Sequence, residues 1–358
     1  MEQRKPSEWS WQILAQAWRE HQFASADRGS FWESEFMTDF FYERDADLAV
    51  LNGQQVAVVG YGNQGRPWAL NLRDSGLAVS VHVRADETRE QAIADGFEAG
   101  DIADASSADV ICVLIPDDSI PGLGLSPRPE ALTIVASGYT LAFDRFNPDG
   151  DIAMVAPRML GPEVRRCYEE GVGFITAVGV HRDVTGSAQD RMLAVARAIG
   201  GLRQGAIAMT PYQEAVLDLA VEQLLSPVLT HVNTNFVLVL LELGIPLEAI
   251  TTELFYSGEV ERNYRLLREI GFVAQLDHHS PASQYGQLSR RGRFDHVDVA
   301  TTMRELIEDI TSGRFADEWD AEAAAGGPTL AELRDQHAGE LMKAVEADLR
   351  AKLGPSAS

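Results

Sequence analysis

Cysteine is scarce in this sequence, and its scarcity excludes the small cross-linked folds. Only Cys112 and Cys167 occur among 358 residues, which is too few for a disulfide scaffold or a cysteine-rich zinc site. Cys112 lies in an apolar run and Cys167 in a predicted helix, so we expect two buried free thiols. Unpaired thiols are typical of the reducing cytoplasm, where we predict this protein to reside.

Basic residues are also in deficit, with 30 Lys and Arg against 54 Asp and Glu and a formal net charge of −24. Such a chain repels nucleic acids and anionic membrane surfaces, so we expect neither as a partner.

Long apolar runs are missing as well. The longest, Phe236 to Leu241, is too short to cross a bilayer, and no N-terminal segment resembles a signal peptide.

The residues between 54 and about 190 alternate between strand and helix patterns. Predicted strands lie at 55–60, 78–84, 109–117, 132–138 and 152–158, with an edge strand at 173–180. The intervening patterns at 66–76 and 87–96 predict helices that end at Gly76 and Gly96. This alternation is typical of a parallel sheet with helices on its faces.

The remainder of the chain shows only helical periodicity, in the segments 190–200, 211–244, 246–271, 299–313 and 329–354. We therefore predict an α/β Rossmann domain with a parallel sheet at 46–190, followed by an all-α domain at 191–350. Residues 1–45 form an N-terminal extension. Its segment 9–21, WSWQILAQAWREH, has the spacing of a short amphipathic helix.

A glycine-rich segment, GYGNQG at 60–65, follows the first strand and opens a helix. In such a βαβ setting Gly60 permits a tight turn, Gly62 lets the backbone approach a pyrophosphate, and Gly65 lets the helix pack on the strand. The free N–H groups of the helix N-terminus then bind the phosphates. The segment predicts a dinucleotide site made by Gly60, Tyr61, Gly62, Asn63, Gln64 and Gly65.

The end of the second predicted strand bears on the choice between NADPH and NADH. Arg84 and Thr88 there suit a 2′-phosphate, whereas Asp86 and Glu87 suit a free 2′-hydroxyl and repel a phosphate. The two signals oppose one another. We expect NADPH, with NADH as the alternative.

Six stretches in order give this chain a wider likeness. The opening FFYERDADLAVLNGQQVAVVGYGNQGRPWALNLRDSG is followed by LIPDD, MVAPRMLGPEVRRCYEEGVGF, LDLAVEQ, SPASQYG and ITSGRFADEW. Together they resemble the class I ketol-acid reductoisomerases over roughly residues 40–350. That resemblance implies reduction and rearrangement of acetohydroxy acids with NADPH, or sometimes NADH, and two Mg²⁺ ions. It also implies a knotted helical domain and a homodimer whose subunits share active sites.

The resemblance assigns the metal ligands. Asp218 and Glu222 stand where the family has its bridging aspartate and first glutamate, one helical turn apart on one face, and Mg²⁺ prefers oxygen ligands. For the second glutamate pair, counting forward from ELGIPLE gives Glu253 and Ser257. Counting back from SPASQYG gives Phe255 and Glu259. One carboxylate is lost either way, and we adopt Glu253 because the forward count needs no gap.

Other family positions have changed. Ser137 replaces a histidine near the nicotinamide, and Arg158 replaces a lysine, so a group that can lose its proton becomes one that cannot. Ser280 matches the substrate-contacting serine, beside which His278 or His279 is a candidate acid. The matching segments also place Asp117 and Gly161 with the cofactor.

These changes favour hydride transfer over alkyl migration, because migration needs the full two-metal cluster and reduction needs only the cofactor and an electrophile for the carbonyl. We therefore predict an NAD(P)H-dependent reductase that acts on a ketone or imine of a small carboxylated substrate, with Asp218, Glu222, Arg158 and Ser137 as catalytic residues. The first alternative is an authentic ketol-acid reductoisomerase. The second is a non-catalytic scaffold that binds the cofactor.

Overall fold

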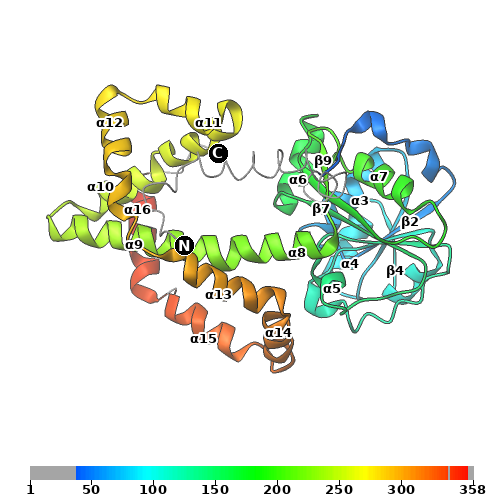
Figure 1. The fold of residues 1–358 in the computed structure, drawn as a ribbon. Helices are drawn as coiled ribbons and strands as arrows, with labels where there is room; N and C mark the ends of the chain where they lie inside the picture. Colours follow the sequence, from blue (N-terminus) through cyan, green and yellow to red (C-terminus); the bar gives the residue numbers. More distant parts are fainter. Residues whose placement is uncertain (1–37, 338, 354–358) are drawn as a thin grey trace, which may run out of the picture. The chain divides into compact units, whose positions relative to one another are not determined.

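The structure is a computed structural model that describes residues 38–337 and 339–353 (Figure 1). The helix predicted at 9–21 lies outside these residues. The chain divides into one unit that ends at Leu219 and another that begins at Ala220. This division falls later than the expected boundary at residue 190, because a further strand after that residue pairs with the sheet of the first unit.

The first unit is built on a nine-stranded sheet with the order β1-β9-β8-β7-β6-β5-β2-β3-β4. The strands are β1 Phe40–Phe41, β2 Gln55–Val59, β3 Ala78–His82, β4 Glu98–Gly100, β5 Val110–Val113, β6 Leu132–Val135, β7 Asp151–Pro157, β8 Thr176–Arg182 and β9 Ala206–Ala208. All six strands expected from the sequence are present. Strands β1, β4 and β9 are not predicted by the sequence, because they have only two or three residues each and therefore show no strand periodicity.

The central sheet is parallel from β4 through β7, as predicted. Beyond β7 it becomes mixed, because β8 runs antiparallel to β7 and β1 antiparallel to β9. The expectation that β8 is an edge strand was wrong, since β9 pairs with its far side. The strand order reverses between β2 and β5, and such a switch point opens a crevice at the carboxyl ends of those strands.

Helices cover this sheet: α3 Gly65–Asp74, α4 Glu87–Ala94, α5 Tyr139–Ala142, α6 Gly161–Glu169 and α7 Ala188–Ala198. Helix α8 Pro211–Ala220 follows the last strand, β9. Short 3₁₀ turns lie at η3 Glu43–Asp45, η4 Leu48–Leu51, η5 Ile102–Ser107 and η6 Asp117–Ser119. Val56 and Val58 of β2 belong to one hydrophobic cluster and Ala57 and Val59 to a second. Both sheet faces are therefore buried, as expected of a doubly covered parallel sheet.

Both thiols are buried and free, as predicted. Cys112 lies on β5 and Cys167 on α6. Burial raises the pKa of the Cys112 thiol to about 12, so this group stays protonated and unreactive at neutral pH.

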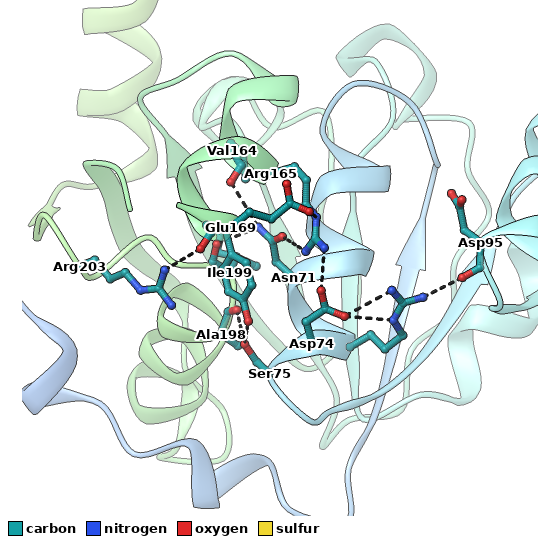
Figure 2. Close-up of polar contacts among 12 residues, drawn as sticks. Asn71, Asp74, Ser75, Asp95, Val164, Arg165, Glu169, Ala198, Ile199 and Arg203 are labelled. Atoms are coloured by element: carbon teal, nitrogen blue, oxygen red, sulfur yellow. Dashed lines mark hydrogen bonds and ion pairs between the residues drawn. The ribbon is translucent and has the colours of Figure 1, made fainter. Parts of the chain in front are cut away.

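Helix α3, which follows the glycine turn, is fixed by a buried amide (Figure 2). Asn71 donates through Nδ2 to the carbonyl oxygens of Ile199 at 3.0 Å and Val164 at 3.4 Å, and accepts from Arg165 Nη1 at 2.8 Å. Arg165 also donates to Asp74 Oδ2 at 2.7 Å. These bonds join the C-terminal half of α3 to α6 and to the end of α7, and so fix the orientation of the helix that follows the glycine turn.

The second unit is helical throughout its described residues. Its elements are η7 Val221–Leu225, α9 Ser226–Glu242, α10 Leu247–Thr251, η8 Thr252–Tyr256, α11 Glu259–Ala274, η9 Gln275–His278, α12 Pro281–Arg290, η10 Arg291–Phe294, α13 Val299–Thr311, α14 Arg314–Ala324, α15 Pro328–His337 and α16 Glu340–Leu353. The segment predicted at 246–271 is broken at Gly258, which has a left-handed φ of 73°. The predicted all-α domain is confirmed, and the knot stays a prediction.

The helical unit buries little apolar surface within itself. Among its described residues only Ile250, Ile310, Ala316 and Leu349 are buried hydrophobic side chains. Residues Pro211–Glu242 also form one continuous helix that is long and apolar enough, by length and composition alone, to cross a membrane. The uninterrupted apolar run within this helix, Phe236 to Leu241, is much shorter than the helix itself and therefore did not predict this property.

Candidate nucleotide and substrate site

A cleft of about 530 Å³ opens at the carboxyl ends of β2, β3, β5 and β6, at the strand-order switch point. It is lined by Gly60, Tyr61, Gly62, Asn63, Gln64, Val83, Arg84, Asp86, Thr88, Ile102, Val113, Leu114, Ile115, Pro116, Asp117, Ile120, Val135, Ala136 and Ser137. Most of the predicted cofactor residues are therefore brought together in one place. Gly65 and Gly161 do not line the cleft.

The three glycines of the turn have separate steric roles. Gly60 has a φ of +98°, and a Cβ there would lie 2.5 Å from the Leu114 carbonyl oxygen. A Cβ on Gly65 would lie 2.2 Å from the Gly60 carbonyl oxygen. By contrast, no atom lies within 4 Å of the position of a Cβ on Gly62. The first and third glycines therefore close the turn, and the second leaves open space at the cleft wall.

The side chains of the turn are fixed by hydrogen bonds. Tyr61 donates its hydroxyl to Asp95 Oδ2 at 2.8 Å, and burial raises its pKa well above the usual range. Gln64 donates to the Met159 carbonyl oxygen at 3.3 Å. A Cβ on Gly161 would lie 2.0 Å from the Asn63 carbonyl oxygen, so Gly161 supports the turn by close packing from outside the cleft.

The residues expected to choose between NADPH and NADH lie at the ribose end of the cleft, and the structure places only some of them in its lining. Asp86 caps α4 by accepting from the Thr88 N–H at 3.0 Å, and its other oxygen lies 3.6 Å from Arg84 Nε. Arg89 is tied instead to the Val83 carbonyl oxygen at 2.6 Å and does not line the cleft. Glu87 does not line it either, so a ribose there would meet one carboxylate, one guanidinium and one hydroxyl.

At the other end of the cleft, Ser137 and Asp117 lie close to a group of charged residues. Ser137 Oγ accepts from the Tyr139 N–H at 3.2 Å. The next residue, Gly138, donates its N–H to Glu214 Oε2 at 2.7 Å. A Cβ on Gly138 would lie 2.1 Å from the Pro211 carbonyl oxygen, so only glycine allows α8 to come this close.

Arg158 follows β7 and bridges two carboxylates of α8. Its Nη1 lies 2.5 Å from Glu214 Oε1, and its Nη2 lies 2.7 Å from Asp218 Oδ1. The Glu214 side chain is only 3% exposed and that of Asp218 is 44% exposed. Burial raises the pKa of Glu214, and the Gly138 N–H and Arg158 act against that shift. Arg158 therefore neutralises a carboxylate that would otherwise be buried without a cation.

Sequence reasoning missed Glu214. It lies one helical turn before Asp218, on the same face of α8. That spacing was the only signal in the sequence that could have indicated it.

The Asp117 carboxyl lies near this charge cluster, and its ionisation is expected to affect the stability of the folded protein. Burial, together with the nearby carboxylates of Glu214, Asp118 and Asp218, raises the pKa of Asp117 to about 6. A carboxyl whose pKa is higher in the folded than in the unfolded state lowers stability as pH rises from about 4 through 6. We expect Asp117→Asn to raise the free energy of unfolding by about 1–3 kcal/mol at pH 8, with the gain vanishing near pH 4.

Urea denaturation at both pH values measures this gain. The neighbouring exposed residue provides the matched control, and Asp118→Asn is expected to change stability by less than about 0.5 kcal/mol at either pH. A stabilisation by Asp117→Asn that is the same at pH 4 and pH 8 would mean that ionisation of Asp117 is not its cause.

The resemblance implies a divalent metal site at Asp218, Glu222 and Glu253. The described part of the chain contains no group of three or more His, Cys, Asp or Glu residues that could hold a metal ion. Asp218 is already paired with Arg158. As they stand, the residues around Asp218 do not fit a divalent ion, and the assignment of Asp218, Glu222 and Glu253 as shared ligands stays a prediction.

The predicted residues of the helical unit lie on short irregular elements. Glu222 lies in the π-helical turn η7 and Glu253 in the π-helical turn η8. Such turns inside α-helices occur frequently at functional sites. Ser280 caps α12 by accepting from the Ser283 N–H at 3.3 Å, and His279 interacts with Gln275 Oε1 at 3.3 Å. The contact of Ser280 and His279 with a substrate stays a prediction.

A dinucleotide, in contrast, fits the cleft. The open space beside Gly62 faces the cleft at the N-terminus of α3, and a helix N-terminus is suited to bind phosphate through its first N–H groups. Apolar side chains such as Ile115, Ile120 and Val135 line the cleft beyond the turn. The site combines an anion-binding turn with an apolar wall, as nicotinamide nucleotides require.

Comparison with known proteins identifies two family models. Residues 50–205 match the model described as acetohydroxy acid isomeroreductase, NADPH-binding domain. Residues 212–354 match the model described as ketol-acid reductoisomerase, C-terminal domain.

Among curated proteins, the ketol-acid reductoisomerase (NADP(+)) of Caldivirga maquilingensis is 36% identical over 324 residues, covering 88% of this chain and 98% of the relative. The ketol-acid reductoisomerase (NAD(P)(+)) of Metallosphaera sedula is 36% identical over 301 residues, covering 81% of this chain and 89% of the relative. Among solved structures, an NADH-preferring ketol-acid reductoisomerase from an uncultured archean superposes with a TM-score of 0.80 at 29% identity. It covers 87% of this chain and 98% of that one.

Proposed function

Because this chain belongs to the ketol-acid reductoisomerase family and is thus an NAD(P)H-dependent oxidoreductase, we propose that it is a ketol-acid reductoisomerase. The observation that carries this proposal is the consecutive match of both family models over residues 50–354. Relatives that carry the same name extend over more than four-fifths of the chain. The reductoisomerase reading, given above as an alternative, is therefore better supported than a reductase with a different substrate or a non-catalytic scaffold.

In the proposed reaction, an alkyl group of a 2-hydroxy-3-oxo acid such as 2-acetolactate migrates from C2 to C3. The C2 hydroxyl becomes a ketone and the C3 ketone becomes a hydroxyl. When bound, the reduced nicotinamide supplies the hydride that reduces the new C2 ketone, and a proton from solvent completes the diol. The glycine turn would hold the pyrophosphate, Ser137 would lie beside the ring, and Arg158 would place a fixed positive charge near the carboxylate or the developing oxyanion.

Oxidation of NADPH and NADH with two substrates tests this proposal. The first is 2-acetolactate, which must rearrange before it is reduced. The second is 3-hydroxy-3-methyl-2-oxobutanoate, which is the rearranged ketone. We expect turnover of both and growth rescue of an isoleucine–valine auxotroph. Absence of acetolactate turnover at every Mg²⁺ concentration would contradict the proposal.

One observation favours a second candidate function, reduction without migration. Asp218, the predicted bridging ligand, is already paired with Arg158, and one carboxylate of the family cluster is missing from the sequence. In this case the rearranged ketone and simple 2-keto acids would be reduced, whereas 2-acetolactate would not be consumed. The same pair of substrates therefore distinguishes the two functions.

We expect the nucleotide preference to depend on Asp86. Its carboxylate caps α4 at the ribose end of the cleft, where it suits a free 2′-hydroxyl and repels a 2′-phosphate. Serine is also a good N-cap residue, so Asp86→Ser should keep the helix start and remove the charge. We expect it to raise the ratio of kcat/KM for NADPH over NADH by about tenfold or more, which is ~1.4 kcal/mol.

Steady-state kinetics with NADPH and with NADH measure this ratio of kcat/KM values, and two further variants are compared with Asp86→Ser. Glu87→Gln removes a charge next to Asp86 but outside the cleft, and should leave the ratio unchanged. Arg84→Ala should move it toward NADH. An unchanged ratio in Asp86→Ser would mean that the ribose does not meet this carboxylate.

We also propose that the protein is a homodimer. The helical unit has only four buried hydrophobic residues in its described part and leaves apolar side chains of α9 exposed, including Val232, Leu238 and Val239 at more than half. An unpaired helical unit with so small a core would be marginal on its own. Multi-angle light scattering should give twice the mass of 39.2 kDa, and an active monomer would contradict the proposal.

A second copy of the chain also explains the apolar helix Pro211–Glu242 without a membrane, since a subunit interface buries the same side chains. The strongly acidic composition and the two free thiols favour a cytoplasmic protein without nucleic-acid or membrane partners. These assignments are part of the same proposal.

A further inference from the structure

Arg158 is held in place from one side. Glu214 is buried, and its second oxygen already accepts the Gly138 N–H. The remaining oxygen needs a cation, and Arg158 supplies one at 2.5 Å. The backbone N–H of Arg158 donates to the Ile175 carbonyl oxygen at 2.9 Å, so the start of this side chain is fixed as well. Because an unpaired buried carboxylate is costly, the first arm of the guanidinium cannot readily leave Glu214.

The planar guanidinium then directs its second arm to Asp218. Nη2 lies 2.7 Å from Asp218 Oδ1, so one rigid fork joins both carboxylates. A lysine has a single ammonium group at its end and could not hold Glu214 and Asp218 with the same two-armed geometry. Arginine also keeps its charge at every accessible pH, so neither arm is released by loss of a proton.

We infer that Arg158 competes with divalent cations for Asp218 and makes this carboxylate a weak metal ligand. A cation that approaches Asp218 must displace Nη2 or bind beside a fixed positive charge, and either event opposes binding. The guanidinium supplies, at Asp218, part of the positive charge that a metal ion would bring.

Binding of Mn²⁺ to the full-length protein without substrate tests this inference, with loss of the free-ion electron paramagnetic resonance signal as the readout. We expect Arg158→Lys to bind Mn²⁺ at least about tenfold more tightly than the wild type, since it keeps a cation beside Glu214 and frees Asp218. This gain should disappear in the double variant that also carries Asp218→Asn. Arg128→Lys alters a comparable pair, 2.7 Å from Asp109 Oδ1 and outside the cleft, and should not change the affinity.

Equal affinity of Arg158→Lys and the wild type would overturn the inference, as would a gain that persists in the double variant. A second measurement does not depend on folding of the Arg158 variant. Asp218→Asn alone should change the affinity of the wild-type chain less than about threefold, because Arg158 already masks this carboxylate. A loss of tenfold or more would show that Asp218 binds the ion despite Arg158. The measurements involve no turnover, so they stand apart from the outcome of the acetolactate assay.

Discussion

Gly62→Ala is expected to weaken NADPH and NADH binding by about a hundredfold, which is ~2.7 kcal/mol, and to leave the thermal midpoint almost unchanged. No atom lies within 4 Å of the added Cβ, and Gly62 does not have a left-handed φ, so the folded chain accepts alanine. The methyl group would project at the point where the backbone must approach the pyrophosphate. Binding is therefore lost without a loss of folding.

Gly65→Ala is expected to reduce both nucleotide binding and the stability of the folded protein. Its Cβ would lie 2.2 Å from the Gly60 carbonyl oxygen, which is a backbone atom that cannot rotate away. The start of α3 must then move from β2, with a loss of about 2–4 kcal/mol of stability and of nucleotide binding at the displaced helix N-terminus. The contrast between the two alanines separates ligand contact from helix packing.

Isothermal calorimetry with each nucleotide and thermal melting monitored by circular dichroism measure the two effects. Gly122→Ala is a suitable control, because its Cβ would also meet no atom within 4 Å and the residue does not line the cleft. It should leave both quantities unchanged. Wild-type affinity in Gly62→Ala would mean that the pyrophosphate does not bind at this turn.

The second large effect is expected at Asp151, which is fully buried at the start of β7. It accepts hydrogen bonds from the Val184 N–H at 2.6 Å, the Thr185 N–H at 3.0 Å and the Thr185 hydroxyl at 2.6 Å. Arg191 of α7 forms an ion pair with it. Asp151→Ala leaves Arg191 as an uncompensated buried charge, and we expect a loss of about 3–5 kcal/mol.

This effect has a defined pH dependence. Burial raises the pKa of Asp151, but the hydrogen bonds from Thr185 and Val184 and the ion pair with Arg191 outweigh burial and hold this pKa below its ordinary value. An acid with a depressed folded pKa stabilises the protein above its unfolded pKa, and that contribution is lost as the pH falls through the folded value. The cost of Asp151→Ala, measured by urea denaturation, should therefore be complete at pH 7 and shrink below pH 4.

The exposed pair formed by Arg166 and Glu163 is the matched control for this prediction. Glu163→Gln should cost less than about 0.5 kcal/mol, because solvent screens a surface ion pair. The double variant Asp151→Asn with Arg191→Met should recover part of the loss, since neither charge is then left without its partner. A single-site loss below about 1 kcal/mol would show that water enters this site in the folded protein.

The sequence was sufficient for those features whose physical cause is local. The glycine turn requires specific residue types at 60, 62 and 65, within reach of one another, and its prediction agrees with the cleft. Strand periodicity predicted β2, β3, β5, β6, β7 and β8, because each has enough residues to show a pattern. Short strands such as β9 were not predicted, because three residues are too few to show a pattern. The direction of β8 depends on its pairing with β7, which no local pattern expresses.

The side-chain pairs, by contrast, were decided only by the tertiary structure. Arg158 meets Glu214 and Asp218 across separations of 56 and 60 residues, and Asp151 meets Arg191 across 40. Sequence reasoning assigned Arg158 as a replacement for lysine but could not show that its guanidinium is held by two carboxylates. A residue's chemistry follows from its type, whereas its charge environment follows from which distant residues the fold brings within 3 Å.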